Sequence, residues 1–440
     1  MQYCSQRFFQ IVVLALLFVT GGARASDDAV GVYAAFQESV FQVRIIELAS
    51  GSQASLGSGF IIADGTLLAT NYHVVSSKIF EPEKYRIEIE KDDTSWVLDV
   101  VAVDAVHDLA LLAIAEDPDA DETESIDSVE PAGLVGRPFI LDSGLPEKGE
   151  TLYSLGNPHD IGMTVVEGNF NGLVEHRFVE QIHFSGAINP GMSGGPVVNK
   201  NSQVVGVNVA TSGNQIGFLV PGSALSALLV NHQEAPSAEP LLQSIADQIA
   251  SHTSSMVAAA LDTEWERAQL GGVMISSSPL PWLECWGNSD KDKKAQTFTV
   301  SRGCHSGQAL YLSHGFSSGY FEYEYMFFEA KSWPSFSVYQ YLAQETGHAV
   351  PGNRGPTEQL ASYRCLDREV ENAQGLRARV SYCVRPYKKL KGLNDVFYMA
   401  VSVDRDHESV MAHYTLSGVT QASAQQLLAH FSEVLAWPSL

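Results

Sequence analysis

A stretch dense in glycine and proline, AINPGMSGGPVVN at residues 187–199, restricts the fold of this chain more than any other. Ser193 lies within it, two residues after Gly191 and directly before Gly194. A helix does not tolerate this density of glycine and proline, and an ordinary strand does not need it. The stretch predicts a tight loop in which the backbone N–H groups of Gly191 and Ser193 point into one space beside the Ser193 hydroxyl. A simple turn between two strands is the alternative.

A loop of this kind suits acyl transfer, because it places a nucleophile beside donors that can stabilise an oxyanion. A serine hydroxyl needs a base to take its proton, and the base needs a third group to orient it. His73 ends the strand-like run LLATNYHVV, and Asp108 precedes the apolar run LALLAI. Alone, each is more simply a core histidine or a turn residue. Together, in the order His73, Asp108, Ser193, they predict a catalytic triad.

Six segments resemble the trypsin-like serine proteases of the HtrA/Deg type, in that family's order and over roughly residues 29–233. They are GSGFII, LLATNYHVV, HDLALLAI, YSLGNP, AINPGMSGGPVVN and IGFLVP. The resemblance implies a chymotrypsin-like fold of two six-stranded β-barrels with the triad in the cleft between them. It also implies that His73 is the general base, Asp108 its orienting group and Ser193 the nucleophile, with the Gly191 and Ser193 amides as the oxyanion hole.

The resemblance also bears on substrate choice. Ala187 corresponds to the floor of the family's primary specificity pocket, and no acidic residue occurs at residues 185–192. We therefore expect preference for a small or medium aliphatic side chain before the scissile bond. Met192, where the family usually has asparagine, is expected at the edge of the cleft. An edge to which substrate adds as a strand is expected at Asn208, Val209 and Ala210.

The N-terminus is typical of an export signal. Arg7 is the only charged residue before the apolar run FFQIVVLALLFV, and Ala23-Arg24-Ala25 forms a small-x-small cleavage site. An uncleaved anchor is the alternative. The formal net charge of −24 disfavours nucleic acid and anionic membrane surfaces as partners. We expect an exported, periplasmic or secreted protein with no membrane span after signal cleavage.

The export signal, the resemblance to the HtrA/Deg proteases and the linker-like composition that follows them together predict four parts. They are a signal peptide at 1–25, the trypsin-like protease domain at 29–233, a linker and helix at 234–270, and a disulfide-containing α+β domain of unknown role at 271–440. The fold class is therefore mainly β in the N-terminal domain, followed by a helical linker and an α+β domain. At 440 residues the chain is long enough for two or three buried cores.

An acidic run, EDPDADETESIDSVE at residues 116–130, interrupts the protease segment. Three of its aspartates have the first ligand spacings of a calcium loop. However, Glu122 takes the place of the glycine in such loops, and Ser128 that of the closing glutamate. The run predicts a solvated insertion. Neither a metal nor a cofactor is predicted for the chain.

Four cysteines lie in the C-terminal half, at Cys285, Cys304, Cys365 and Cys383. An even number in an exported chain predicts two disulfides, and the absence of CxxC disfavours zinc. Three pairings are open. Short loops close most easily, which favours Cys285–Cys304 and Cys365–Cys383. Free buried thiols remain the alternative.

The linker is expected to continue as a helix from Leu241 to about Gln269. Its apolar residues gather near one face: Leu242, Ile245, Ile249, Met256 and Trp265. This stripe either docks onto a neighbouring domain or allows self-association as a homo-oligomer.

Seven later runs read as strands: TFTVS, ALYLS, YFEYEYMFFEA, SFSVYQYL, LRARVSYCV, DVFYMAVSV and SVMAHYTL. In the third run, aromatic residues alternate at Phe321, Tyr323, Tyr325 and Phe327. They form either the core face of a sheet or an aromatic groove for a peptide or glycan. The chain is expected to end in a helix with Leu427 and Phe431 on its apolar side.

These patterns predict an exported serine endopeptidase that hydrolyses peptide bonds of protein or peptide substrates through an acyl-enzyme. The alternative is a protease-fold binding or scaffold protein whose site is closed or inactive and is regulated by the C-terminal domain. A third hypothesis places the function in the C-terminal domain, as a receptor-like module.

Overall fold

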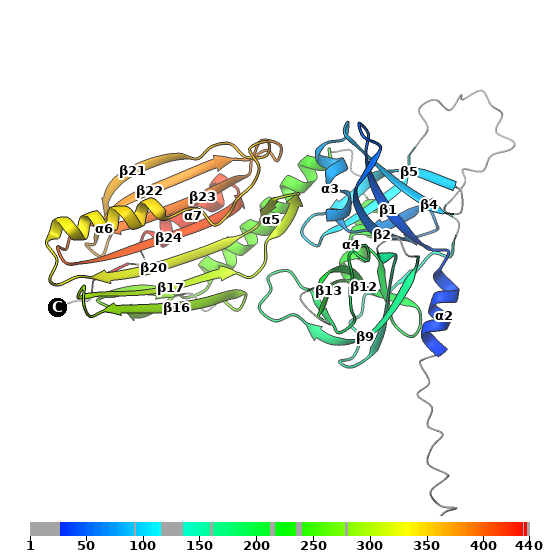
Figure 1. Cartoon of the computed structure of the whole chain (residues 1–440), viewed down its shortest axis with the longest axis horizontal. Helices are drawn as coiled ribbons and strands as arrows, with labels where there is room; N and C mark the ends of the chain where they lie inside the picture. The colour runs from blue at the N-terminus through cyan, green and yellow to red at the C-terminus, as the bar shows by residue number, and fades with distance from the viewer. Residues whose placement is uncertain are drawn as a thin grey trace, which may run out of the picture.

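The computed structural model describes residues 27–91, 94–115, 134, 136–158, 162–211, 216–234, 240–277, 280–433 and 435–437. Figure 1 shows two β-rich units side by side along the long axis, joined by the long helix α5 (Leu241–Asp262). The expected signal peptide and the acidic run at 116–130 lie outside the described residues. Among the residues described, no helix has the length and apolar character needed to cross a membrane.

The first barrel is closed, with the strand order β1-β2-β3-β6-β5-β4. Its alternating and fully apolar strands put aliphatic side chains inside, which is why Val43, Leu68 and Leu112 are completely buried. Helix α3 (Tyr72–Phe80) lies between β3 and β4 in the chain. The strands are β1 (Val40–Glu47), β2 (Ser52–Ile62), β3 (Leu67–Thr70), β4 (Tyr85–Lys91), β5 (Thr94–Asp104) and β6 (Leu109–Ile114).

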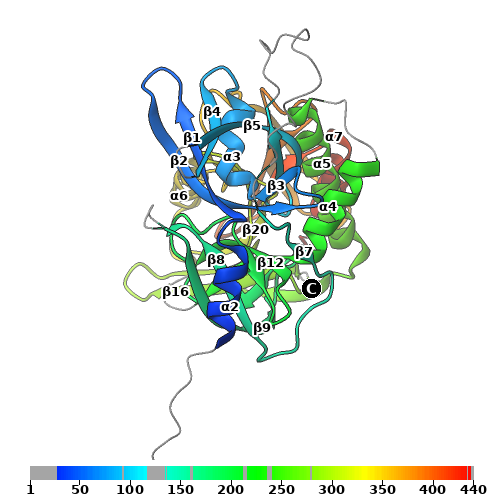
Figure 2. The same ribbon diagram turned by 90° about the vertical axis from the view of Figure 1, so that its right-hand side faces the viewer.

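The second barrel has the order β11-β8-β9-β10-β13-β12, closed by pairing of β11 with β12, and β7 adds to β12 in parallel. Its strands are β7 (Ile140–Leu141), β8 (Thr151–Gly156), β9 (Thr164–Leu173), β10 (Ile182–Phe184), β11 (Pro196–Val198), β12 (Gln203–Thr211) and β13 (Gly217–Pro221). In Figure 2 the first barrel lies above the second, beside helix α4 (Gly222–Glu234). The predicted pair of six-stranded barrels is confirmed. Helix α2 (Asp27–Phe36) packs on them, with Phe36 stacked on Phe139.

The C-terminal unit is a seven-stranded antiparallel sheet of order β16-β17-β20-β24-β23-β22-β21. Helices α5 and α7 (Gln421–Phe431) pack on one face and α6 (Ser335–His348) on the other. The strands are β16 (Leu283–Asp292), β17 (Thr297–Ser306), β20 (Phe321–Glu329), β21 (Arg364–Glu371), β22 (Arg377–Pro386), β23 (Asn394–Ser402) and β24 (Glu408–Val419). Two hairpins complete it, β14 (Glu266–Leu270) with β15 (Val273–Ser277), and β18 (Leu310–Ser313) with β19 (Phe316–Ser318).

The strand predicted for SFSVYQYL is wrong, because this run forms helix α6. Val338 and Leu342, four residues apart, are buried against Phe328 and Met411, whereas Phe336 is 77% exposed. This is the burial pattern of a helix face, since side chains at i and i+4 lie one above the other. The other six predicted runs all contribute to strands.

The alternating aromatic residues of β20 are the core face of the sheet. Phe321, Tyr323, Tyr325 and Phe327 are each at most 2% exposed, in one core with helix α7. No aromatic groove is therefore open on this face of β20.

Both favoured disulfides are present, Cys285–Cys304 and Cys365–Cys383. Each joins two residues that are direct cross-strand partners, in β16–β17 and in β21–β22. The two bridges therefore cross-link the outermost strand pair at each edge of the sheet.

Helix α5 ends at Asp262, earlier than predicted, and connects the cores of the two units. Ile245 and Ile249 are buried against the first barrel, whereas Met256 is buried against the C-terminal sheet. The docking interpretation of the apolar stripe is correct. These residues face the interior of the chain, so the alternative of self-association through this stripe is not supported.

Candidate active site

The predicted base begins a helix rather than ending a strand. Strand β3 stops at Thr70, and His73 lies in the first turn of α3. The backbone N–H of His73 donates to Asp108 Oδ1 at 2.8 Å. Tyr72 N–H and the Asn71 side-chain amide donate to the carbonyl oxygen of Asp108, at 3.1 and 2.8 Å. The start of the helix is thus fixed onto Asp108.

Asp108 lies in the turn between β5 and β6 with a φ of 59°, in the left-handed region. This conformation is uncommon outside glycine and is most tolerated by aspartate and asparagine. It lets the carbonyl and the carboxylate of one residue meet the same helix terminus. This backbone conformation was not predicted from the sequence.

The side chains of His73 and Asp108 form a close pair, with His73 Nδ1 at 2.6 Å from Asp108 Oδ2. An ionised carboxylate only accepts, so Nδ1 carries the proton and Nε2 has a free lone pair. Burial lowers the pKa of His73, but the charge of Asp108 and its hydrogen bond raise it, and the net shift is upward. A histidine in this state can take a proton at Nε2 and is stabilised once charged.

The glycines of the serine loop are required by its backbone. Gly191 and Gly194 have φ values of 94° and 85°. A Cβ on Gly194 would lie 2.2 Å from the carbonyl oxygen of Ser58 and 2.4 Å from Thr70 Oγ1. The loop is thus packed directly against the first barrel, and no larger residue fits at Gly194.

Ser58, in β2, holds this loop from the other barrel. Its N–H donates to the carbonyl of Ser193 at 2.7 Å, and its hydroxyl donates to the carbonyl of Gly191 at 2.7 Å. Its side chain is fully buried and also accepts from the Asn157 N–H at 2.9 Å. Ser58 was not among the predicted site residues, although it lies in the GSGFII motif, where a serine between two glycines was the available signal.

The two amides predicted for the oxyanion hole are in one tight turn. Met192 N–H donates to Asn189 O at 3.0 Å, and Gly194 N–H to Asn208 O at 2.9 Å. No hydrogen bond occupies the N–H of Gly191 or Ser193 within the part of the chain that is described. These two donors, on either side of Met192, are available to a ligand.

The Ser193 hydroxyl is turned away from the base. It donates to the carbonyl oxygen of Val209 at 3.0 Å. The described residues show no hydrogen bond from Ser193 to His73. The structure therefore brings the acid–base pair together and places the serine loop beside it, with the serine in a rotamer that does not engage the base.

The residues expected to bind substrate differ in how accessible they are in the structure. Ala187 is exposed, between β10 and the serine loop. Asn208 is fully buried, and its N–H and C=O pair with Gly195 and Gly194, so its backbone offers no free edge. Ala210 pairs with Phe218 of β13, and binding of substrate along Val209 and Ala210 stays a prediction. Met192 is fully buried in the second barrel, which corrects its expected place at the edge of the cleft.

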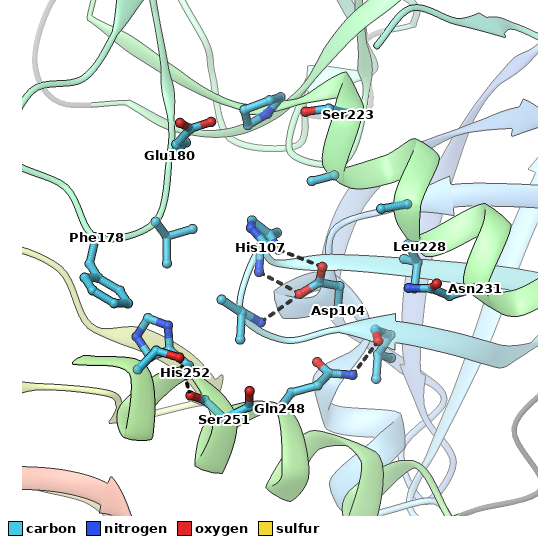
Figure 3. A pocket seen from close by; sticks show the side chains of 17 residues that line it. Asp104, His107, Phe178, Glu180, Ser223, Leu228, Asn231, Gln248, Ser251 and His252 are labelled. Atoms are coloured by element: carbon cyan, nitrogen blue, oxygen red, sulfur yellow. Dashed lines mark hydrogen bonds and ion pairs between the residues drawn. The ribbon is translucent and has the colours of Figure 1, made fainter. Parts of the chain in front are cut away.

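A second aspartate–histidine pair lies just before Asp108, and the sequence analysis did not single it out. His107 Nδ1 is 2.7 Å from Asp104 Oδ2. Figure 3 shows the pair at the wall of a cavity of about 660 Å³, with Gln248 and His252 of α5 on the neighbouring wall. Burial lowers the pKa of His252 to about 4, and His107 adds to the shift. Helix α5 therefore borders the turn that carries the predicted triad aspartate.

Comparison with known proteins agrees with this geometry. Residues 57–207 match the family model of the trypsin-like peptidase domain. A probable periplasmic serine endoprotease DegP-like of Rickettsia prowazekii is 33% identical over 189 residues, covering 40% of this chain and 33% of that protein. Serine protease HTR4 of Rattus norvegicus is 29% identical, covering 41% and 35% respectively. The crystal structure of Deg5 is 24% identical with a TM-score of 0.39, covering 48% of this chain and 96% of that one.

The chain spans about a third of the length of these curated relatives. The match to the family model lies within the two barrels. Residues 57–207 of this chain thus match the trypsin-like peptidase domain, and the chain is similar to HtrA/DegP serine proteases over about 40% of its length.

Proposed function

We propose that the protein is an exported serine endopeptidase that hydrolyses peptide bonds through an acyl-enzyme. The observation that carries the proposal is the 2.6 Å contact between His73 Nδ1 and Asp108 Oδ2, beside the Ser193 loop. In this proposal residues 1–25 are a removable signal and 29–233 are the protease domain. Residues 234–270 connect it to a separate domain at 271–440.

The reaction begins with proton transfer. Ser193 Oγ attacks the carbonyl carbon of the scissile peptide and gives its proton to His73 Nε2. The resulting oxyanion accepts hydrogen bonds from the N–H groups of Gly191 and Ser193. Asp108 stabilises the charged imidazole and keeps its ring oriented, and remains ionised throughout.

The intermediate then collapses, the C–N bond breaks, and the leaving amine takes the proton from His73. Water attacks the Ser193 ester, with His73 as base, and the departing Ser193 oxygen recovers the proton. The Ser193 hydroxyl must first leave Val209 O, since it donates there at rest. Rotation about χ1 is fast, and substrate binding at Val209 would favour it by taking over this carbonyl.

Substrate choice follows from the loop before the serine. Residues 185–192 contain no carboxylate, so a lysine or arginine side chain bound there would have no counter-charge. The proposal is therefore a preference for small or medium aliphatic residues before the scissile bond, with Ala187 contributing to the pocket. A peptide library cleaved mainly after lysine or arginine would contradict it.

The direct test is labelling of the mature protein with a fluorophosphonate, read as intact mass, beside hydrolysis of an unfolded protein. Wild type should gain one adduct and Ser193→Ala none. The variant should lose about 10⁶-fold in kcat, because the nucleophile is removed. Hydrolysis by Ser193→Ala at a rate near wild type would show that Ser193 is not the nucleophile.

The orientation of Ser193 supports one alternative, a protease-fold binding protein whose site is closed. In that case wild type would bind unfolded protein but take up no fluorophosphonate at any pH. Labelling that appears only when a peptide is added would instead indicate an enzyme that substrate activates.

A further inference from the structure

The hairpin β18–β19 belongs to the C-terminal half of the chain but packs on the helix that carries His73. Leu310, Leu312 and Phe316 are at most 4% exposed, in the same core as Val74 and Val75 of α3. At its centre the Tyr72 hydroxyl donates to the carbonyl of Leu312 at 2.7 Å, and both groups are buried. The hairpin is thus bonded to the residue that directly precedes His73.

Tyr311, in this hairpin, contacts the imidazole of His73. The two ring centroids are 6.0 Å apart and the rings cross at 76°, an edge-to-face arrangement. Tyr311 is partly buried between Leu310 and Leu312, whose side chains are fixed in the core shared with α3. Its ring therefore restricts the space in which the imidazole can move.

The far end of the hairpin is fixed to the interior of the C-terminal unit. Ser318 and Tyr387 share a hydrogen bond of 2.8 Å between hydroxyls, and Tyr387 donates to Asp395 at 2.6 Å. Asp395 is fully buried and is also bonded to Arg385 at 2.8 Å. A satisfied buried network of this kind is rigid. The position of Tyr311 thus depends on the C-terminal unit as well as on the packing of the hairpin against α3.

We propose that Tyr311 is a positioning residue for His73, through which the C-terminal unit holds the imidazole in the orientation that meets Asp108. Edge-to-face aromatic contact is attractive and directional, so it favours one orientation of the ring. Small displacements of catalytic groups are costly for rate. The proposal rests on the proposed function of the same triad, but it makes a prediction about His73 that does not require turnover.

The test compares Tyr311→Ala and Tyr311→Phe with wild type in the full-length mature protein. Tyr311→Ala should lower kcat by about 10- to 100-fold with KM changed less than about 2-fold, because ring orientation affects the chemical step. Tyr311→Phe keeps the ring and should recover most of the activity. Tyr339→Ala is the matched control, since Tyr339 is 41% exposed on α6 and should leave both constants unchanged.

The second readout is the titration of His73 by NMR with ¹³C-labelled histidine. If Tyr311 positions the ring, its removal loosens the bond to Asp108, and the raised pKa of His73 falls toward its ordinary value. If Tyr311 only excluded water, the pKa would rise, because burial lowers it. A rise in the pKa of His73 overturns the proposal. A result in which neither the pKa nor kcat changes also overturns it.

Two further observations distinguish a positioning role from simple packing and from failure of the proposed function. Tyr311→Leu keeps apolar volume and the packing of the hairpin, so it should keep the melting temperature yet share the kcat loss of Tyr311→Ala. Equal activity of Tyr311→Leu and wild type would reduce Tyr311 to a packing residue. If wild type shows no turnover but the His73 titration responds as expected, the proposed function fails while the positioning role stands.

Discussion

At the scale of single residues, the candidate site depends on Asp108 meeting His73 with two atoms. Oδ1 accepts from the backbone N–H and Oδ2 from the ring, at 2.8 and 2.6 Å. One carboxylate therefore fixes both the place of the residue and the orientation of its ring. Its charge also raises the pKa of His73.

This gives a prediction of pH dependence. Wild type should lose kcat/KM on acidification, as His73 is protonated, with a midpoint above the ordinary pKa of histidine. Asp108→Asn removes the charge, so the midpoint should move to lower pH, and kcat should fall about 10⁴-fold. Steady-state rates from pH 5 to 9 measure both effects, with exposed Glu180→Gln as control. An unchanged midpoint in Asp108→Asn would mean that Asp108 does not act on the base.

Ser58 gives a second prediction at this scale. Ser58→Ala removes the hydroxyl that donates to Gly191 O. The peptide group between Gly191 and Met192 then loses the hydrogen bond that fixes its orientation. We expect kcat to fall about 10- to 100-fold at nearly constant KM, somewhat less than the loss of a whole oxyanion donor. Ser226→Ala is the control, because that hydroxyl bonds only within α4. Equal kcat for both variants would show that the loop is held without Ser58.

At the scale of elements, α5 secures the turn that carries Asp108. The side-chain amide of Gln248 donates to Val103 O at 2.8 Å and accepts from Ala105 N–H at 2.7 Å. It bonds two backbone groups near the turn, and the nearer of them, Ala105, lies three residues before Asp108. The helix is thus part of the support of the first barrel as well as a link to the second unit.

Gln248→Ala should therefore destabilise the protein by about 1–3 kcal/mol, because two partly buried backbone groups lose their partner. Urea unfolding measures the change. Gln243→Ala, on the same helix, is the control, since its side chain bonds only to exposed Asp247 and should change stability by less than about 0.5 kcal/mol. If the two variants were equally stable, the contact would add nothing to the fold.

At the scale of the whole molecule, the two units differ in how they are held together. The barrels contain no disulfide among their described residues, whereas the sheet has one bridge at each edge. A bridge across a short loop restricts the unfolded chain and thereby favours folding. Loss of a bridge should therefore lower the stability of the C-terminal unit and leave that of the barrels nearly unchanged.

Replacing Cys365 and Cys383 together by serine should lower the stability of the C-terminal unit by about 3 kcal/mol. Calorimetry should show its unfolding transition at lower temperature. Fluorophosphonate labelling at 25 °C should persist, because the sheet and its hairpin still fold. Loss of labelling in the folded variant would indicate that the bridge itself is needed by the active site.

Local patterns were sufficient for features that involve neighbouring residues. Glycine at residues 191 and 194 is required by the backbone of the loop, apolar alternation marks most strands, and short loops favoured the two disulfides that form. Long-range packing set whatever depends on residues far apart in the chain. It made α6 a helix, because the buried pair Val338 and Leu342 packs on the sheet. It also brought Ser58 and Tyr311 to the candidate site, bonded Gln248 to Ala105 and turned Ser193 to Val209, since no local pattern encodes which distant groups become neighbours.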